Sequence, residues 1–130
     1  MAIDRTKVLE AAQQHAQEGN YEQAIAEFQR LVADDPRDVR ALLKIGDLQI
    51  KMGDVPAAIA TYARVAEIYT EQGIHLKAVA VYKQMLKLDP ERLDVYPKLT
   101  AAYEALGLRG EALGACDQLA AYHLRDGRVP

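Results

Sequence analysis

The sequence predicts an all-α fold, in which about seven helices pair as antiparallel hairpins and stack into a solenoid. Three observations point to it. Hydrophobic residues make up 50% of the 130 positions and aromatic residues only 6%, and this alanine-rich mix suits close helix packing better than a sheet. A short glycine-to-aromatic motif recurs along the chain. Asp-Pro dipeptides follow two of the segments that the motif marks.

The recurring motif is a glycine, then an alanine, then an aromatic residue at fixed spacing. The glycine suits a turn through left-handed backbone, which other residues adopt at a cost. The alanine lets two helix backbones approach closely, and the aromatic ring one turn later fills the space between neighbouring pairs. Three complete copies, and one with a thiol in the aromatic position, are Gly19, Ala24 and Phe28; Gly53, Ala58 and Tyr62; Gly73, Ala78 and Tyr82; and Gly107, Ala112 and Cys116.

The motif and the helix-breaking residues together predict where each helix begins and ends. Proline cannot continue a helical hydrogen-bond ladder, so the Asp-Pro dipeptides at 35–36 and 89–90 end the helices before them. Pro56 and Pro97 fit the first turns of helices, where their missing N–H groups are not needed. Gly46 lies inside a helix, where glycine costs about 1 kcal/mol relative to alanine, so we expect a packing reason for it. The expected helices span residues 4–18, 21–34, 38–52, 55–71, 75–88, 92–106 and 109–126.

With these residues the chain resembles the tetratricopeptide repeat family of bacterial type, whose unit is a helix–turn–helix of about 34 residues. Four units match in phase and cover essentially the whole chain, although none has a Trp at the start of its first helix. The resemblance implies a right-handed α-solenoid, a single domain over residues 1–130 and a function in protein binding. The matching residues are Ala12, Gly19, Tyr21, Ala24, Phe28 and Pro36; Gly46, Gly53, Ala58 and Tyr62; Ala66, Tyr69, Gly73, Ala78, Tyr82 and Pro90; and Tyr103, Gly107 and Ala112.

The turn glycines depart from the even spacing of that family. They fall at positions 19, 53, 73, 107 and 127, so spacings of 34 and 20 alternate and make a 54-residue unit of three helices. In this hypothesis the helix at 55–71 closes one repeat and opens the next, and the curvature of the array changes there. The repeats then span about 5–38, 39–72, 59–92 and 93–126 and overlap. Because Gly127 would open a further unit, we expect an N-terminal fragment of a longer array, or an end that a partner or second copy covers.

The resemblance also implies where a partner binds, since the first helix of each pair lines a concave groove in this family. Binding of a C-terminal carboxylate, as in chaperone docking, is disfavoured, because that clamp needs Lys and Asn where this chain has Leu9, Gln13, Leu43 and Asp47. The apolar members could instead pack between helices, and the pattern does not decide between the two. The expected groove residues are Leu9, Gln13, Gln17, Arg40, Leu43, Asp47, Ile50, Lys51 and Glu67, with Thr6, Ala63, Thr70, Ala101 and Glu104 beside them.

No arrangement of residues is typical of catalysis or of metal binding. The chain has no serine, and His15, His75 and His123 share no ligand spacing, so surface or turn positions explain them better. Cys116, the only cysteine, takes the aromatic position of the motif, and we expect a buried, inert side chain rather than a reactive thiol. We therefore expect no enzyme, no cofactor and no metal.

Charge and hydropathy disfavour two classes of partner, nucleic acid and membrane. A net charge of −3 and a pI near 5.6 disfavour nucleic acid, and the tyrosines at motif positions fit a core better than a base-stacking platform. No apolar run reaches the roughly 18 residues that membrane insertion needs, there is no secretory signal, and a lone cysteine favours a reducing compartment. We expect a cytoplasmic protein.

The function that fits is a scaffold that binds a protein or peptide partner in its groove and helps to assemble or localise a bacterial complex, for instance in motility or secretion. The alternative is self-assembly. The final expected helix carries Leu119, Tyr122 and Leu124, which could form a homo-oligomer with another copy.

Overall fold

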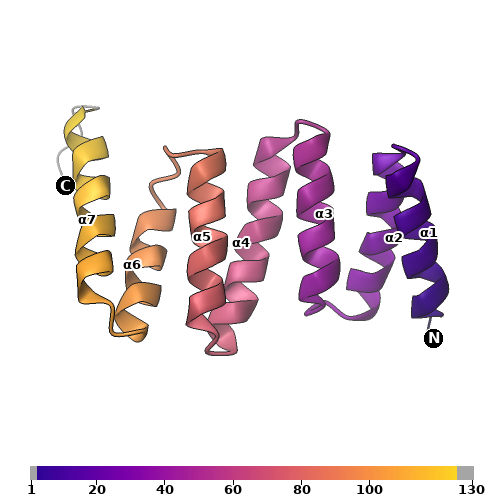
Figure 1. Ribbon diagram of the computed structural model, residues 1–130, viewed down its shortest axis with the longest axis horizontal. Helices are drawn as coiled ribbons and strands as arrows, with labels where there is room; N and C mark the ends of the chain where they lie inside the picture. The colour runs from indigo at the N-terminus through magenta and orange to yellow at the C-terminus, as the bar shows by residue number, and fades with distance from the viewer. Residues whose placement is uncertain (1–2, 126–130) are drawn as a thin grey trace. The chain divides into compact units, whose positions relative to one another are not determined.

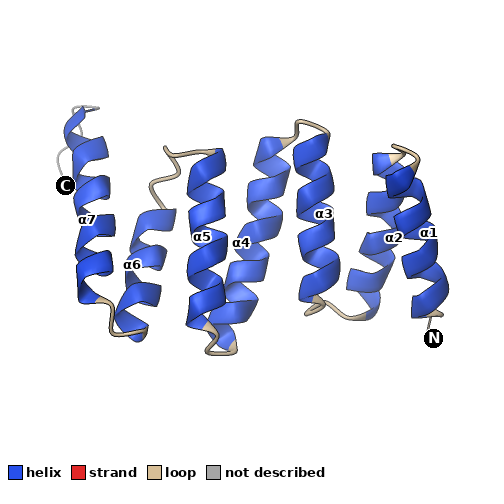
Figure 2. Ribbon diagram, viewed as in Figure 1, coloured by secondary structure: helices blue, strands red, loops and turns tan. Residues whose placement is uncertain are grey.

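The computed structural model describes residues 3–125, and within this range the chain is helical with no strand (Figures 1 and 2). The predicted all-α class is confirmed. The opening of a further unit at Gly127 lies outside the described residues. The seven helices of this range are α1 (Arg5–Gln17), α2 (Tyr21–Asp34), α3 (Val39–Lys51), α4 (Val55–Glu71), α5 (His75–Leu88), α6 (Val95–Ala105) and α7 (Arg109–Arg125).

The chain divides into two compact units, residues 1–65 and 66–130, and the division falls inside α4. In the first unit α1, α2 and α3 run antiparallel in sequence order, and the first part of α4 follows them. The second unit contains the rest of α4 and the antiparallel helices α5, α6 and α7. None of the described helices combines the length and apolar character that crossing a lipid bilayer requires.

Tight turns with a left-handed glycine join the helices of four hairpins. Gly19 has φ 79° and Gly53 has φ 78°, and two further turn glycines match them closely. At the first turn the N–H of Asn20 donates to the carbonyl of His15 at 2.8 Å, which satisfies a carbonyl that the end of α1 would leave unpaired. The prediction that these glycines turn through left-handed backbone is confirmed.

The two Asp-Pro loops also repeat one local geometry. Asp35 and Asp89 both end their helices in extended backbone. The carboxylate of Asp35 accepts a hydrogen bond from the N–H of Arg37, and that of Asp89 accepts one from the N–H of Glu91, each at 3.1 Å. The turn types therefore recur where the sequence places them, whereas the 54-residue repeat as a whole stays a prediction.

Helix α6 starts later than the sequence predicted, at Val95 rather than near 92. An aspartate before a helix usually caps it, as Asp38 does for α3 by accepting from the N–H of Ala41 at 3.1 Å. The carboxylate of Asp94 makes no such cap: the backbone of Asp94 is already helical, and its carboxylate pairs with the guanidinium of Arg92 at 3.2 Å. That ion pair also lowers the pKa of Asp94.

The alanine and aromatic positions of the first three copies of the motif are buried, as the sequence predicts. Ala24, Ala58 and Ala78 are fully buried, and Phe28 is 2% exposed. Small side chains at these points let the helices approach closely, and the ring fills the space that remains. The core cluster of the first unit consists of Val8, Ala12, Ala24, Phe28, Leu31, Ala41, Ile45 and Leu48.

Gly46 has the packing reason that the sequence predicted. A Cβ atom added there would lie 2.9 Å from Cε1 and 3.0 Å from Cζ of Tyr62. The tyrosine ring thus lies directly against the backbone of α3, in space that any larger residue would occupy.

The prediction of a buried Cys116 is wrong, because the side chain is exposed. In α2 the same motif position is covered by α3. Among the described residues no helix follows α7 that could cover Cys116 in the same way. Burial at this position needs a neighbouring helix as well as the motif.

Candidate partner-binding groove

Two adjoining cavities of the first unit form a groove between α1 and α3, with α2 as its floor. They share Gln13, Phe28 and Lys44, so one continues into the other. The first has a volume of about 350 Å³ and is lined by Arg5, Thr6, Leu9, Gln13, Phe28, Leu31, Asp38, Arg40, Ala41 and Lys44. The second has a volume of about 550 Å³ and is lined by Gln13, Ala16, Gln17, Phe28, Lys44, Asp47, Leu48 and Lys51.

The groove has an apolar floor and a mostly polar rim. Phe28 and Leu31 form the floor and are almost fully buried, whereas Leu9 on α1 is 40% exposed. Gln13 and Gln17 continue the α1 wall toward its C-terminal end. An apolar base inside a polar rim is the usual anatomy of a protein interface.

The structure brings together six of the predicted groove residues in the first unit. The charged lining positions on α3, which are 40, 44, 47 and 51, follow a spacing of four, three and four residues, which keeps them on one helix face. Leu43 and Ile50 each precede a lining residue by one position, a rotation of about 100°, and they are half-buried and line neither cavity. Glu67 belongs to the second unit. The residues brought together are Leu9, Gln13, Gln17, Arg40, Asp47 and Lys51.

Lys44 lines both cavities and was missed from the sequence. The signal was present, since Lys44 follows Arg40 by one helical turn and precedes Asp47 by three residues. Of the other positions expected near the groove, Thr6 lines it, while half-buried Ala63 does not. Thr70, Ala101 and Glu104 lie in the second unit.

Asp47 is held in place by Tyr62 of α4. The Tyr62 hydroxyl donates to the Asp47 carboxylate at 2.5 Å. Burial of the ring, and then this hydrogen bond, raise the pKa of Tyr62 well above its usual value. The same tyrosine therefore fills the space beside Gly46 and fixes a groove carboxylate.

The raised pKa of Tyr62 predicts a loss of stability in alkali. A tyrosine in the unfolded chain loses its proton at about pH 10, whereas Tyr62 in the folded protein keeps its proton to higher pH. The unfolded state then binds fewer protons, so the free energy of unfolding falls as pH rises, by at most about 1.4 kcal/mol per pH unit from this group. Urea unfolding at about pH 8.5 and about pH 11 should show a smaller loss for Tyr62→Phe than for the wild type. The control is Tyr69→Phe, which should lose as much stability between the two pH values as the wild type does. The prediction would be contradicted if Tyr62→Phe lost as much stability as the wild type, or if Tyr69→Phe showed the same smaller loss as Tyr62→Phe.

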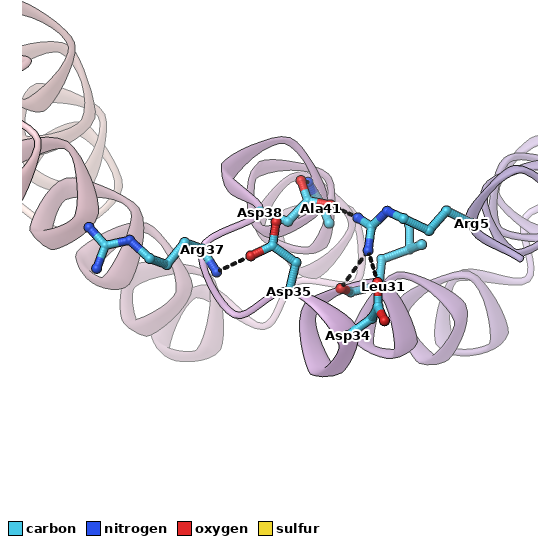
Figure 3. A network of polar contacts seen from close by, with 7 residues as sticks. All are labelled: Arg5, Leu31, Asp34, Asp35, Arg37, Asp38 and Ala41. Carbon is cyan, nitrogen blue, oxygen red and sulfur yellow. Dashed lines mark hydrogen bonds and ion pairs between the residues drawn. The ribbon is translucent and has the colours of Figure 1, made fainter. Parts of the chain in front are cut away.

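A cluster of ion pairs includes two residues that line the first cavity, Arg5 and Asp38 (Figure 3). The Arg5 guanidinium donates to the Asp34 carboxylate at 2.5 Å and also pairs with the Asp38 carboxylate. Asp38 in turn caps α3, so Arg5 links the start of α1 to the end of α2 and the start of α3. The hydrogen bond to Asp34 raises the pKa of Arg5. Two of the charges that line the groove, on Arg5 and Asp38, therefore already face each other, and Arg5 shares its charge with Asp34.

The second unit has a cavity of its own that the sequence did not predict. It lies between α5 and α7 over α6 and has a volume of about 530 Å³. The rings of Tyr96 and Tyr122 are 5.8 Å apart, and the Tyr96 hydroxyl donates to the carbonyl of Pro90 at 3.1 Å. Burial of the ring raises the pKa of Tyr96 to about 12. The lining residues are Lys83, Leu86, Lys87, Pro90, Tyr96, Leu99, Tyr103, Glu111, Gly114, Ala115, Gln118 and Tyr122.

A third kind of site, around Cys116, is open to solvent. Thr100, Glu104 and Cys116 line a cavity of about 420 Å³ between α6 and α7, and the Thr100 hydroxyl lies 3.6 Å from the Cys116 sulfur. Over residues 3–125, no three His, Cys, Asp or Glu side chains come together as a metal ion would need. The groove between α1 and α3 is the candidate site in which most of the predicted binding residues come together.

Comparisons with known proteins agree with the repeat pattern. A family model described as tetratricopeptide repeat matches residues 15–77. A search of curated proteins finds no match.

Several solved structures are similar to the chain. One, described as the MamA protein, is 20% identical, with a TM-score of 0.48, over 98% of this chain and 80% of that one. A tetratricopeptide repeat protein from Parabacteroides merdae is 18% identical, with a TM-score of 0.45, over 91% of this chain and 53% of that one. A thermophilic repeat protein of Thermus thermophilus is 22% identical, with a TM-score of 0.42, over 90% of this chain and 73% of that one.

Proposed function

Because the chain is a tetratricopeptide repeat protein, we propose that it is a non-enzymatic scaffold that binds a peptide or helix of a partner protein in the groove between α1 and α3. The repeat fold is typical of protein-interaction scaffolds. One observation carries the proposal: the two adjoining cavities form a single groove with an apolar floor and a polar rim. The binding residues are Leu9, Gln13, Gln17, Arg40, Lys44, Asp47 and Lys51.

The shape of the groove suits an elongated ligand. Its lining runs along α3 from Arg40 to Lys51, a rise of about 16 Å at 1.5 Å per residue. A partner helix of three turns, or an extended peptide of five residues, covers about that length. Leu9 beside the Phe28 floor would receive one apolar side chain of such a segment.

We place this scaffold in the cytoplasm of a bacterium, where it would help to assemble or localise a larger complex of the motility or secretion type. The overall resemblance to bacterial repeat proteins supports this setting. The test of binding below does not depend on it.

Leu9→Glu is expected to abolish partner capture without loss of helicity. Burying a leucine on binding contributes about 1.5–3 kcal/mol, so an unfavourable charge there should weaken binding more than about tenfold. The measurement is pull-down from an extract of the source cells, with circular dichroism as the check on folding. The matched control is Leu76→Glu on α5, which also replaces an exposed leucine (68%). Capture that survives Leu9→Glu, or is lost equally in Leu76→Glu, would rule out this groove.

A second candidate function is self-assembly through α7. Leu113 and Leu124 are 65% and 71% exposed. They lie on one face of this helix, about 16 Å apart along its axis, and large exposed apolar side chains on one face suit association with another copy. Light scattering over a range of protein concentrations separates the two functions. A mass that rises with concentration, and that Leu113→Glu with Leu124→Glu returns to the monomer value, would favour self-assembly.

A further inference from the structure

We propose that the groove between α1 and α3 selects acidic partner segments, whose carboxylates pair with Arg40, Lys44 and Lys51 beside an apolar side chain seated over Phe28. This inference rests on the proposed function, since it names the partner chemistry of the same groove. It follows from which groove charges already have partners inside the protein and which do not.

The anionic side chains of the groove are already engaged. Asp38 pairs with Arg5 and also caps α3. Asp47 accepts the short hydrogen bond of Tyr62. These carboxylates therefore have fewer free lone pairs with which to bind a basic ligand.

The cationic side chains of α3 are in the opposite situation. Among the ion pairs of the described residues, none involves Arg40, Lys44 or Lys51. The Lys51 ammonium lies 5.9 Å from the centre of the Tyr21 ring, a weak interaction that leaves its charge unneutralised. Three cations without a carboxylate partner thus line one wall of the groove.

This local excess of positive charge opposes that of the chain as a whole, which carries −3. A cleft with an excess of one sign of charge attracts ligands of the opposite sign and speeds their association. The groove has such an excess, because its lining contains two carboxylates, Asp38 and Asp47, but four cations. Because the rest of the protein repels acidic ligands, the attraction should be confined to the groove.

The spacing of the cations indicates how the carboxylates should be spaced. Arg40 and Lys44 are about 6 Å apart along the helix axis, and Lys44 and Lys51 about 10.5 Å. A partner helix lying along α3 matches this with acidic residues at i, i+4 and i+11. An extended peptide matches only the first pair, with acidic residues two positions apart at about 3.3 Å per residue, because a third one three positions further on would point to the opposite face. The spacing of the cations therefore favours a helical partner.

Phosphates of a nucleic acid would also be attracted to these cations, but the groove does not suit bases. Sequence-tolerant binding of single strands depends on exposed aromatic faces on which bases stack. Phe28, the aromatic residue that lines both cavities, is only 2% exposed. The exposed apolar group is Leu9, which suits an aliphatic side chain of a peptide.

The test is selection of a random dodecamer peptide library on phage against the full chain. The peptides are fused at their carboxyl ends, so a terminal carboxylate cannot contribute. We expect enrichment of acidic peptides that Leu9→Glu and Lys44→Glu no longer retain. The matched charge control is Lys7→Glu, an exposed lysine of α1 outside both cavities, which should retain them.

The affinity of one enriched peptide, measured by fluorescence anisotropy, should fall about tenfold or more in Lys44→Glu and weaken with added salt. Peptides enriched without acidic bias, and retained by Lys44→Glu but not by Leu9→Glu, would overturn this inference and leave the proposed function intact. Failure to enrich any peptide over Leu9→Glu would overturn both. Tighter binding of a labelled single-stranded oligonucleotide than of the peptides, lost in Lys44→Glu, would overturn the choice of a protein partner.

Discussion

Replacing Phe28 with Ala is expected to lower the free energy of unfolding by about 3–5 kcal/mol, the cost of emptying a buried aromatic site. Phe28 is 2% exposed and packs in the core cluster of the first unit, so its removal leaves a void bounded by α1, α2 and α3. Because it is also the floor of the groove, peptide binding should weaken together with stability.

Urea denaturation followed by circular dichroism measures this change. The matched control is Cys116→Ala, which alters the same motif position in α7, where the side chain is exposed. A surface change of that kind should stay within about 0.5 kcal/mol of the wild type. If both substitutions changed the free energy of unfolding equally, burial by a following helix would not determine how much the side chain at this motif position stabilises the fold.

Replacing Gly46 with Val is expected to lower the free energy of unfolding by about 1–3 kcal/mol, as overpacking of a filled core does. The added Cβ would meet the Tyr62 ring at 2.9 Å. The ring cannot move away freely, because its hydroxyl is bound to Asp47 and the residue is 3% exposed. Displacing Tyr62 would also release the Asp47 carboxylate into the groove.

A glycine inside a helix without such a neighbour provides the control. Nothing lies within 4 Å of a Cβ added at Gly114 in α7. Gly114→Ala should therefore raise the free energy of unfolding by about 0.5–1 kcal/mol, because alanine is the better helix former. If Gly46→Val were as well tolerated in urea titrations as Gly114→Ala, the contact with Tyr62 would not be limiting.

Much of the fold could be predicted because its signals are local. A left-handed glycine, an Asp-Pro dipeptide or a first-turn proline acts through the few residues around it, and no distant partner changes its effect. The start of α6 shows the limit of this reasoning. There Asp94 has helical backbone and pairs with Arg92 instead of capping the helix, and neither feature is visible in a spacing pattern.

The candidate site was less predictable, because a groove depends on the rotation of each helix about its axis. Leu43 and Lys44 are neighbours on α3, yet Leu43 lines neither cavity and Lys44 lines both. An error of one residue in the expected rotation of the helix therefore selects the wrong side chain. The pairing of Arg5 with Asp34 and Asp38 joins three helices and decides which groove charges are left for a ligand. The spacing of residues in the sequence predicts neither the rotation of each helix about its axis nor which charged side chains pair with each other.

The tight glycine turns also have a kinetic consequence. Because each turn closes a hairpin within a few residues, the helices that pack together in each unit are neighbours in sequence. Little loop entropy is lost in bringing them together, and chains dominated by such short-range contacts cross the folding barrier in microseconds to milliseconds. Any hairpin that forms first can act as a nucleus on which the next helix docks. Glycines that contribute no side chain to the core therefore govern how quickly that core is assembled.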